Sequence, residues 1–268
     1  MKKILFSAFA LITATSSFGQ DAADKDVQAG LVAGAGLNFQ KMGTKNMVSD
    51  GVGSDLTIGA NVIFSFTETI GLCTGAEFDF NTVKYAPNTS SPTYYRYNDT
   101  QIIPKEESGS GASLFQLDSR EQKGVYLTIP TMLLFRTNFI GYFRYFGKFG
   151  LRNSFLLSSN INDEGIKFDT QTPLGAVATN ENMKAPGDMF FFKSAVGLCG
   201  GAEWNFTGST CLVAELGYYY GITPLHLDRK EDKMTLYTSG LNNGLGNDDY
   251  FNNLATQSQL MFKLSILF

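Results

Sequence analysis

The sequence predicts an all-β protein: an eight-stranded, antiparallel, up-and-down transmembrane β-barrel with long extracellular loops. Three observations predict this fold. Several segments alternate between apolar and polar side chains, the connections between them alternate between long and short, and the last segment, residues 260–268, is apolar at every second position. A strand with lipid on one side and a polar lumen on the other alternates in this way.

The beginning of the chain predicts export. Residues 1–20 combine a basic start, an apolar run over residues 4–14 and small residues at Ser17 and Gly19, which is the pattern of a secretory signal peptide. We therefore expect residues 1–20 to be a signal peptide and residues 21–268 to form the outer-membrane β-barrel domain. After this leader no apolar run approaches the roughly 18 residues that a membrane-spanning helix needs.

The first four predicted strands cover residues 27–41, 55–66, 70–81 and 125–135. Small apolar residues alternate with Gly, Asn and Gln in the first, and Leu, Ile, Val and Phe alternate with Thr, Gly and Asn in the second. The third sets apolar residues against Gly and acidic residues. The fourth has Val, Leu, Ile and Phe in phase, although it contains Pro130, which lacks the N–H that a strand ladder uses.

The last four predicted strands cover residues 142–157, 189–206, 210–222 and a segment that begins near Leu254. Phe and Tyr alternate with Arg and Lys in the fifth strand, Phe, Leu and Trp alternate with Lys, Gly and Glu in the sixth, and Leu and Tyr alternate with Gly and Glu in the seventh. The eighth strand ends with four apolar residues in phase, which we expect the barrel-assembly machinery to recognise: Phe262, Leu264, Ile266 and Phe268.

The connections between these strands alternate in length. The long connections are residues 42–54, 86–124, 158–188 and 227–253. The short connections are residues 67–69, 137–141 and 207–209. In outer-membrane barrels the long loops face outward, whereas the short turns and both termini face the periplasm.

A secreted soluble barrel of the lipocalin type would show the same periodicity with its apolar face inside. Periodicity alone does not distinguish these two folds. The asymmetry of the loops favours the membrane protein. So does a set of aromatic residues near the predicted strand ends, because aromatic residues form girdles at the lipid interface: Phe64, Phe66, Phe143, Tyr145, Trp204, Phe206 and Phe268.

The polar faces of the predicted strands place ten charged side chains in the lumen: Glu77, Asp79, Arg136, Arg144, Lys148, Arg152, Lys193, Glu203, Glu215 and Lys263. These six cations and four anions can largely compensate one another, and a buried charge is tolerated when it is paired and hydrogen-bonded. An eight-stranded barrel is just wide enough for side chains to fill. We therefore expect a filled lumen, with a narrow, cation-lined, anion-favouring pore as the alternative.

Cysteine content and charge exclude several classes of function. Cys73, Cys199 and Cys211 fall on predicted lumen faces, on different strands or at different heights, so we expect small buried side chains rather than a disulfide. No metal-ligand spacing occurs, and the Asn- and Asp-rich residues 160–165 and 242–253 fit turns better than calcium ligands. We expect no metal and no cofactor. A net charge of −4 without a basic cluster predicts no nucleic-acid partner.

Two loop features were considered as functional sites. His226, the only histidine, has Asp228 two residues later, which is a weak signal for a rim enzyme, so we expect an exposed loop residue and no catalytic site. The predicted loop 86–124 contains three aromatic residues and an arginine on a segment that we expect to be exposed. Such residues are enriched at binding hot spots, so this segment is the candidate partner surface: Tyr94, Tyr95, Arg96 and Tyr97.

Residues 126–136, Tyr-Leu-Thr-Ile-Pro-Thr-Met-Leu-Leu-Phe-Arg, resemble the Tyr-Leu-x-Ile-Pro strand of the PorT-like outer-membrane β-barrel family, common in Bacteroidetes. Residues 150–157 are similar to the strand that follows in that family. The resemblance implies a barrel in the outer membrane and no single activity; a few relatives are components of the type IX protein-secretion apparatus. Thr128 is a departure, because the family often carries an acidic residue there.

These observations predict a non-enzymatic outer-membrane protein that is a structural or interaction component of the cell envelope, for example of a secretion or assembly complex. We expect it to contact outer-membrane lipid, the barrel-assembly machinery and other envelope proteins. A narrow channel is the first alternative and a rim enzyme that uses His226 is the second.

Overall fold

The computed structural model describes residues 26–268 except 91, 108–110, 170–171, 208–209 and 240–247. The expected signal peptide, residues 1–20, lies outside the described residues, as does half of the segment 242–253, namely residues 242–247. The only helices among the described residues are two short 3₁₀ turns, η3 (Lys105–Glu107) and η4 (Glu231–Lys233). None of the described helices is long and apolar enough to cross a membrane.

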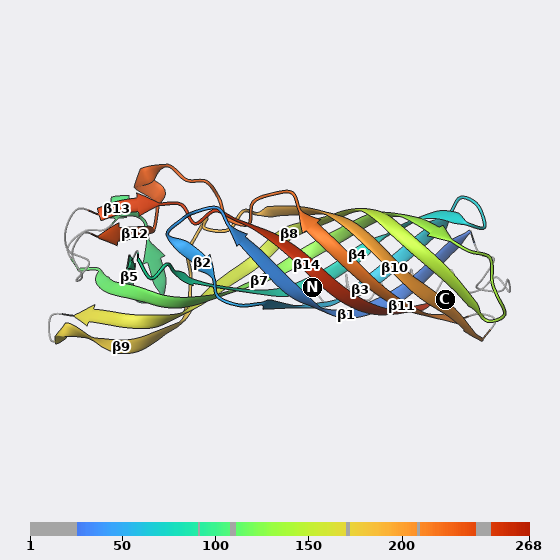
Figure 1. Ribbon diagram of the computed structural model, residues 1–268, viewed down its shortest axis with the longest axis horizontal. Coiled ribbons are helices and arrows are strands. Elements are labelled where there is room, and N and C mark those ends of the chain that lie inside the picture. Colours follow the sequence, from blue (N-terminus) through green and yellow to red (C-terminus); the bar gives the residue numbers. More distant parts are fainter. Residues whose placement is uncertain (1–25, 91, 108–110, 170–171, 208–209, 240–247) are drawn as a thin grey trace, which may run out of the picture.

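Eight strands form a closed ring (Figure 1), and this confirms the predicted barrel fold. Each strand pairs antiparallel with the next, and β14 pairs back with β1 from Gly30 opposite Leu267 to Met42 opposite Ala255. The ring strands, in ring order, are β1 (Val27–Met42), β3 (Gly53–Ser65), β4 (Ile70–Pro87), β7 (Ser113–Arg136), β8 (Phe143–Asp169), β10 (Phe192–Thr207), β11 (Thr210–Gly221) and β14 (Ala255–Leu267).

The alternation of the sequence becomes an alternation of environment. In β3, Leu56 and Ile58 are each 56% exposed, whereas Thr57 between them is fully buried. The apolar face therefore points outward, toward lipid, and the polar face points into the lumen. The apolar residues of the last strand also face outward: Phe262, Leu264, Ile266 and Phe268. The Phe268 N–H donates a 2.8 Å hydrogen bond to the Ala29 carbonyl, so the two ends of the described chain meet at one end of the barrel.

Pro130 is accommodated by a gap in the ladder between β4 and β7. Pairing runs from Ile70 to Thr74 on β4, stops, and resumes at Glu77, which is opposite Thr128. The two interrupted positions of β7 include Pro130, which has no N–H to donate. On its other side Pro130 stays in register with Arg152 of β8, so the strand continues through the proline.

The prediction of long loops is wrong in one respect, because many of the residues in these connections form strands. β4, β7 and β8 extend beyond the ring, and six shorter strands join them: β2 (Met47–Ser49), β5 (Thr93–Asn98), β6 (Gln101–Ile103), β9 (Thr172–Met183), β12 (Leu236–Ser239) and β13 (Asp248–Phe251). We call these short strands, with the outer ends of β4, β7 and β8, the outer cover. Residues 160–165, expected to be a loop, lie within β8.

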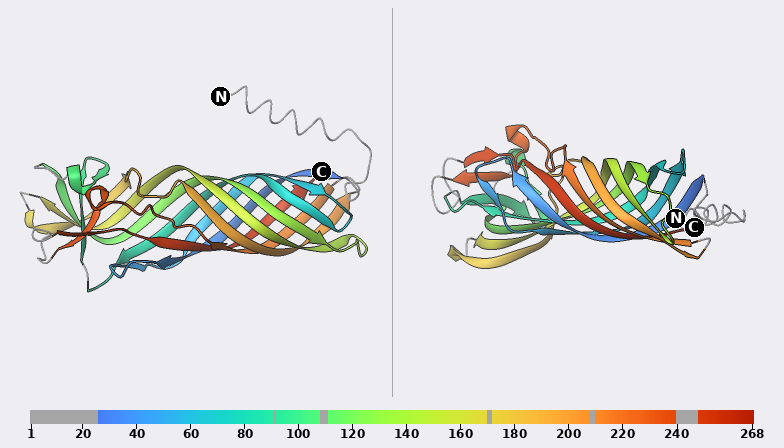
Figure 2. Two further views of the ribbon diagram at one scale, coloured as in Figure 1. Left: turned by 90° about the horizontal axis from the view of Figure 1, so that it is seen from above. Right: turned by 45° about the vertical axis from the view of Figure 1, so that its right-hand side comes forward.

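The outer cover is an open sheet. Its order is β13-β12-β5-β7 on one side of the contact between β7 and β8, and β8-β9 on the other. Figure 2 shows these strands separating at the end opposite the short turns. β13 and β9 therefore end the main path of the sheet, β2 and β6 pair on one side only with β4 and β5, and the ring has no edge.

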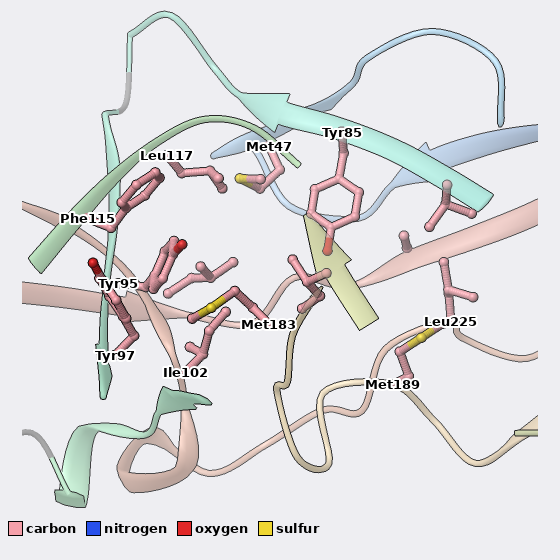
Figure 3. Packing of buried hydrophobic residues seen from close by; sticks show 14 of the residues in the cluster. Met47, Tyr85, Tyr95, Tyr97, Ile102, Phe115, Leu117, Met183, Met189 and Leu225 are labelled. Atoms are coloured by element: carbon pink, nitrogen blue, oxygen red, sulfur yellow. The ribbon is translucent and has the colours of Figure 1, made fainter. Parts of the chain in front are cut away.

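A hydrophobic cluster fills the outer cover (Figure 3). Residues from β4, β5, β7 and β9 converge on it, and Tyr85, Tyr95 and Phe115 are fully buried. Tyr95 packs on Phe115 with ring centroids 5.2 Å apart. We call this cluster the outer core. Burial of these aromatic side chains explains why the long connections fold instead of remaining loops.

The expectation that residues 94–97 form an exposed loop is wrong. Tyr94, Tyr95, Arg96 and Tyr97 belong to β5, and the three tyrosines are 1%, 0% and 6% exposed. Arg96 is half-buried and lies 3.5 Å from Asp248 of β13. Composition alone does not distinguish an exposed loop rich in tyrosine from a buried strand rich in tyrosine. Here the tyrosines belong to a strand, and their rings are buried. These residues therefore stabilise the outer cover and offer no free tyrosine surface.

Candidate functional site

The structure places all ten predicted lumen charges inside the barrel. Each is less than 9% exposed: Glu77, Asp79, Arg136, Arg144, Lys148, Arg152, Lys193, Glu203, Glu215 and Lys263. The inward phase of six ring strands brings them together from positions up to 186 residues apart in the chain. The lumen is therefore the main concentration of buried charge in the described part of the molecule.

Two ion pairs lie toward the end of the barrel that carries the short turns. Arg144 and Glu203 are register partners on β8 and β10, and they form a bidentate pair, with Nε 2.8 Å from Oε2 and Nη2 2.5 Å from Oε1. Lys148 of β8 reaches Glu215 of β11, with 2.5 Å between Nζ and Oε2. Charge-assisted bonds of this length are the strong ones in proteins.

The centre of the lumen holds a network of four charges. Lys263 Nζ lies 2.8 Å from both carboxylate oxygens of Glu77. Arg152 Nη2 lies 3.1 Å from Glu77 Oε2 and 2.6 Å from Asp79 Oδ1. The Thr57 hydroxyl donates to Asp79 at 2.5 Å. These bonds connect β4, β8 and β14 across the lumen, so the centre is filled by paired side chains.

Thr128 belongs to this network. Its hydroxyl donates to Asp79 and lies 2.7 Å from the Ser154 hydroxyl. The neighbouring strand β4 therefore supplies the carboxylate that lies beside Thr128.

Two of the predicted lumen cations have no carboxylate within 4 Å among the described residues. Lys193 donates to Gln257 Oε1 at 3.1 Å and lies 4.3 Å from the centre of the Tyr126 ring. Arg136 donates to Gln28 and Ser65. The predicted charge compensation therefore holds for four of the six lumen cations. The other two contact amide groups, a hydroxyl and an aromatic ring instead of carboxylates.

Asp55 is a lumen charge that the sequence analysis missed. It is 3% exposed, accepts from Asn81 Nδ2 at 3.0 Å and accepts from Gln259. The strand phase could have found it, because Asp55 shares the inward parity of Thr57. It was overlooked because it lies at the predicted start of its strand.

The three cysteines are free and buried, as expected. Cys199 Sγ lies 3.2 Å from the Tyr219 hydroxyl. The Tyr219 ring in turn lies beneath the cations of Arg152 and Lys263, at 5.3 and 5.7 Å from its centre. The cysteines thus fill space between the charged groups. No group of His, Cys, Asp and Glu residues in the described chain could hold a metal ion.

A second polar cluster lies in the outer cover, and the sequence analysis missed it. Arg120 of β7 and Asp163 of β8 are register partners whose side chains form a bidentate pair, both distances 2.7 Å, and both are almost fully buried. Tyr85 donates to Gln122 Oε1 at 2.8 Å, and Gln122 Nε2 donates to Asp188. Burial raises the pKa of Tyr85 above its usual value.

The expectation that His226 is an exposed loop residue is wrong. It is 1% exposed, and its Nε2 lies 2.9 Å from Gln122 Oε1. Because that oxygen can only accept, Nε2 carries the proton and Nδ1 is left as an acceptor with no partner among the described residues. Burial lowers the pKa of His226. Asp228 is exposed and bonds Asn252, so the two residues do not form a catalytic pair.

Three comparisons with known proteins bear on this arrangement. The family model described as "Outer membrane protein beta-barrel domain" matches residues 18–227. No curated protein matches the sequence.

The chain is similar to several solved barrels. For Ail, the attachment invasion locus protein of Yersinia pestis, identity is 9%, coverage 91% of this chain and 100% of that chain, and the TM-score 0.35. For the outer membrane protein OprG of Pseudomonas aeruginosa, identity is 12%, coverage is 93% of this chain and 98% of that chain, and the TM-score is 0.43. For the outer membrane protease OmpT of Escherichia coli, identity is 10%, coverage is 94% of this chain and 99% of that chain, and the TM-score is 0.35.

Proposed function

The chain belongs to the outer membrane protein β-barrel domain family, and we propose that in the outer membrane it is a non-enzymatic docking component of the cell envelope. The surface that binds a partner would be the outer cover, and in particular the free edge of β9. The barrel would anchor this surface in the membrane through its lipid-facing apolar residues.

The filled lumen supports an anchoring role over the pore alternative. Ion pairs occupy it at three heights along β8, at Arg144, Lys148 and Arg152. Conduction needs binding that is weak enough for an ion to leave, whereas the cations here already hold carboxylates at hydrogen-bond distance. The enzyme alternative has no support from His226, whose ring is enclosed by the outer cover.

The edge of β9 is the observation that carries the docking proposal. β9 pairs with β8 along one side, and the sheet ends there apart from one bridge between Lys184 and Gln101. Val177, in the middle of the strand, is 91% exposed. An exposed strand edge with an apolar side chain is a template for another strand, since its unpaired N–H and C=O groups can extend the ladder.

The charges beside β9 specify the chemistry of the partner. A pocket of about 270 Å³ lies beside β9, whose Thr179 and Glu181 line it. Its other charged lining residues are the carboxylates Asp50, Glu121, Asp163 and Glu164 and the cations Lys84 and Arg120. Neither Glu164 nor Glu181 forms an ion pair with a described residue. We therefore propose that the partner is an extended polypeptide segment with apolar and basic residues. Such complementarity steers association and discriminates against acidic segments.

The resemblance of residues 126–136 to PorT-like strands supports placing this docking role in a secretion or assembly complex. Export would use residues 1–20 as a signal peptide. Insertion would use the outward residues of β14, Phe262, Leu264, Ile266 and Phe268, as the contact for the barrel-assembly machinery.

The test is gentle detergent extraction of the tagged native protein with chemical cross-linking, comparing wild type, Val177→Lys and Val177→Thr. Lys at an edge position blocks strand pairing and repels a basic segment, whereas Thr keeps the strand propensity. We expect a stoichiometric partner whose cross-links map to β9, retained with Val177→Thr and lost with Val177→Lys. A partner that Val177→Lys retains, or recovery of the wild type alone, would contradict the proposal.

A further inference from the structure

Arg136 lies at the opposite end of the barrel from the outer cover. Its guanidinium is buried, with 6% of the residue exposed. Nη1 donates to Gln28 Oε1 at 3.0 Å and Nη2 donates to Ser65 Oγ at 2.5 Å. Nε has no hydrogen-bond partner, and no carboxylate of a described residue lies within 4 Å. A buried cation without a counter-charge is costly, so this position favours an anion.

A pocket of about 360 Å³ adjoins this guanidinium. It lies among the turn between β3 and β4, the turn between β7 and β8, and the start of β1, at the end where short turns face the periplasm. We call it the periplasmic pocket. Its lining residues include Asp26, Phe66, Glu68, Arg136, Phe139 and Arg144.

Arg144 brings a second guanidinium to the periplasmic pocket. Its Nε and Nη2 bond Glu203, and its charge lies 4.6 Å from the centre of the Phe139 ring. Nη1 makes no hydrogen bond to a described residue. The buried groups here are therefore two guanidiniums and one carboxylate, which leaves one positive charge in excess. Two of the guanidinium nitrogens, Arg136 Nε and Arg144 Nη1, have no hydrogen-bond partner among the described residues.

We propose that the periplasmic pocket binds a phosphate group through Arg136 and Arg144. Planar guanidiniums offer donors that match phosphate oxygens, and two of them can hold one phosphate from two sides. The position supports this ligand. Phe66 and Tyr142, in the adjoining turns, are 63% and 72% exposed and belong to the aromatic level that marks the lipid interface. The phosphate is that of a phospholipid headgroup or a free phosphate in the periplasm.

Two carboxylates oppose this ligand and provide a sharp test. Asp26 and Glu68 also line the periplasmic pocket, and both are exposed. Solvent screens their repulsion without removing it. Neutralising either one should therefore strengthen phosphate binding, which a purely structural role of Arg136 would not produce.

The experiment is calorimetric titration of the purified full-length barrel in detergent, at constant ionic strength, with inorganic phosphate and separately with short-chain phosphatidylglycerol. We expect Arg136→Gln to weaken saturable binding at least tenfold and Glu68→Gln to strengthen it. Lys45→Gln, which removes an exposed charge at the other end, should change nothing. Binding of the lipid alone would assign the headgroup as the source, and binding of phosphate alone would assign the free ion.

No saturable binding of either probe, or equal affinity in wild type and Arg136→Gln, would overturn the proposal. Should Arg136→Gln fail to fold, Glu68→Gln and Asp26→Asn decide the question, because both change exposed residues. An affinity for phosphate that is the same in these variants as in the wild type would equally overturn it.

Discussion

At the scale of the residue, the lumen charges stabilise the barrel only as pairs. Arg144 and Glu203 are almost fully buried and form a bidentate pair. Removing one member of such a pair leaves the other as an uncompensated buried charge, whereas replacing both by apolar residues of similar size is often neutral. The same reasoning applies to Lys148 with Glu215.

The variant Glu203→Gln should therefore lower the free energy of unfolding by about 3–5 kcal/mol, which is the usual effect of breaking a buried pair. The double variant Arg144→Met/Glu203→Leu should lie closer to the wild type. The measurement is urea unfolding in detergent. Glu231→Gln is the control: its side chain is 67% exposed, so a loss of at most about 1 kcal/mol is expected. Equal losses for the two single variants would refute the pairing argument.

His226 should make the outer cover sensitive to acid. It is buried against Gln122, with Asp188, Arg120 and Arg229 as the charged groups that act on its pKa. Burial lowers the folded-state pKa below the usual 6.5, so the unfolded chain takes up the proton first. The stability that His226 contributes is therefore complete above about pH 6.5 and is lost progressively as the pH falls below that value.

Hydrogen exchange of the β12 and β4 amides at pH 7.5 and pH 5, corrected for the intrinsic rate, measures this loss. We expect faster opening of the outer cover at pH 5 in the wild type. In His226→Gln, which keeps an amide donor for Gln122 and cannot titrate, the difference should disappear. A pH dependence that persists in this variant would show that another group is responsible.

At the scale of the element, the sequence predicted the strands that face lipid and missed those that do not. β3 alternates fully because one face meets lipid and the other the lumen. The outer end of β7 does not, because water replaces lipid there. Its buried positions include Phe115, Leu117, Arg120 and Gln122, and a register shift between Leu117 and Ser119 changes the phase. This part of the sequence therefore shows neither a continuous apolar face nor a constant alternation from which a strand could be predicted.

The candidate site divides in the same way. The lumen charges follow from strand phase, so all ten could be assigned to the interior from the sequence. Which cation meets which carboxylate could not, because Glu77 and Lys263 are 186 residues apart and their contact depends on how the ring closes. The periplasmic pocket depends on two turns lying side by side, and no local pattern encodes that.

The outer cover should unfold separately from the ring. Tyr95 is fully buried, packs on Phe115, and accepts a 2.9 Å hydrogen bond from Asn180 Nδ2, which connects β5 to β9. Tyr95→Ala should cost the outer cover about 3–5 kcal/mol through the cavity it creates. We expect faster limited proteolysis within residues 93–103 while the heat-modifiable migration of the barrel is unchanged. Tyr142→Ala, at an exposed position, is the control and should leave both unchanged. Loss of heat-modifiable migration would contradict the separation.

At the scale of the whole molecule, the two ends of the barrel have different properties. One end carries short turns, and the other carries a folded sheet with an open edge (Figure 2). The periplasmic pocket lies at the first end, and a pocket with an excess of carboxylates lies at the second. Between them the lumen is filled by side chains, most of whose charges are paired. This arrangement supports a docking protein anchored by its barrel, which needs no open lumen, over a channel, which does.

The most direct test of the account is ion conductance of the purified protein in planar lipid bilayers. Because Arg144, Lys148 and Arg152 already hold carboxylates inside the lumen, we predict no discrete conductance steps for the wild type, under conditions in which a porin control inserted in parallel conducts. Stable single-channel steps that favour anions, and that change when Lys148 is replaced by Gln, would contradict the account and establish the pore.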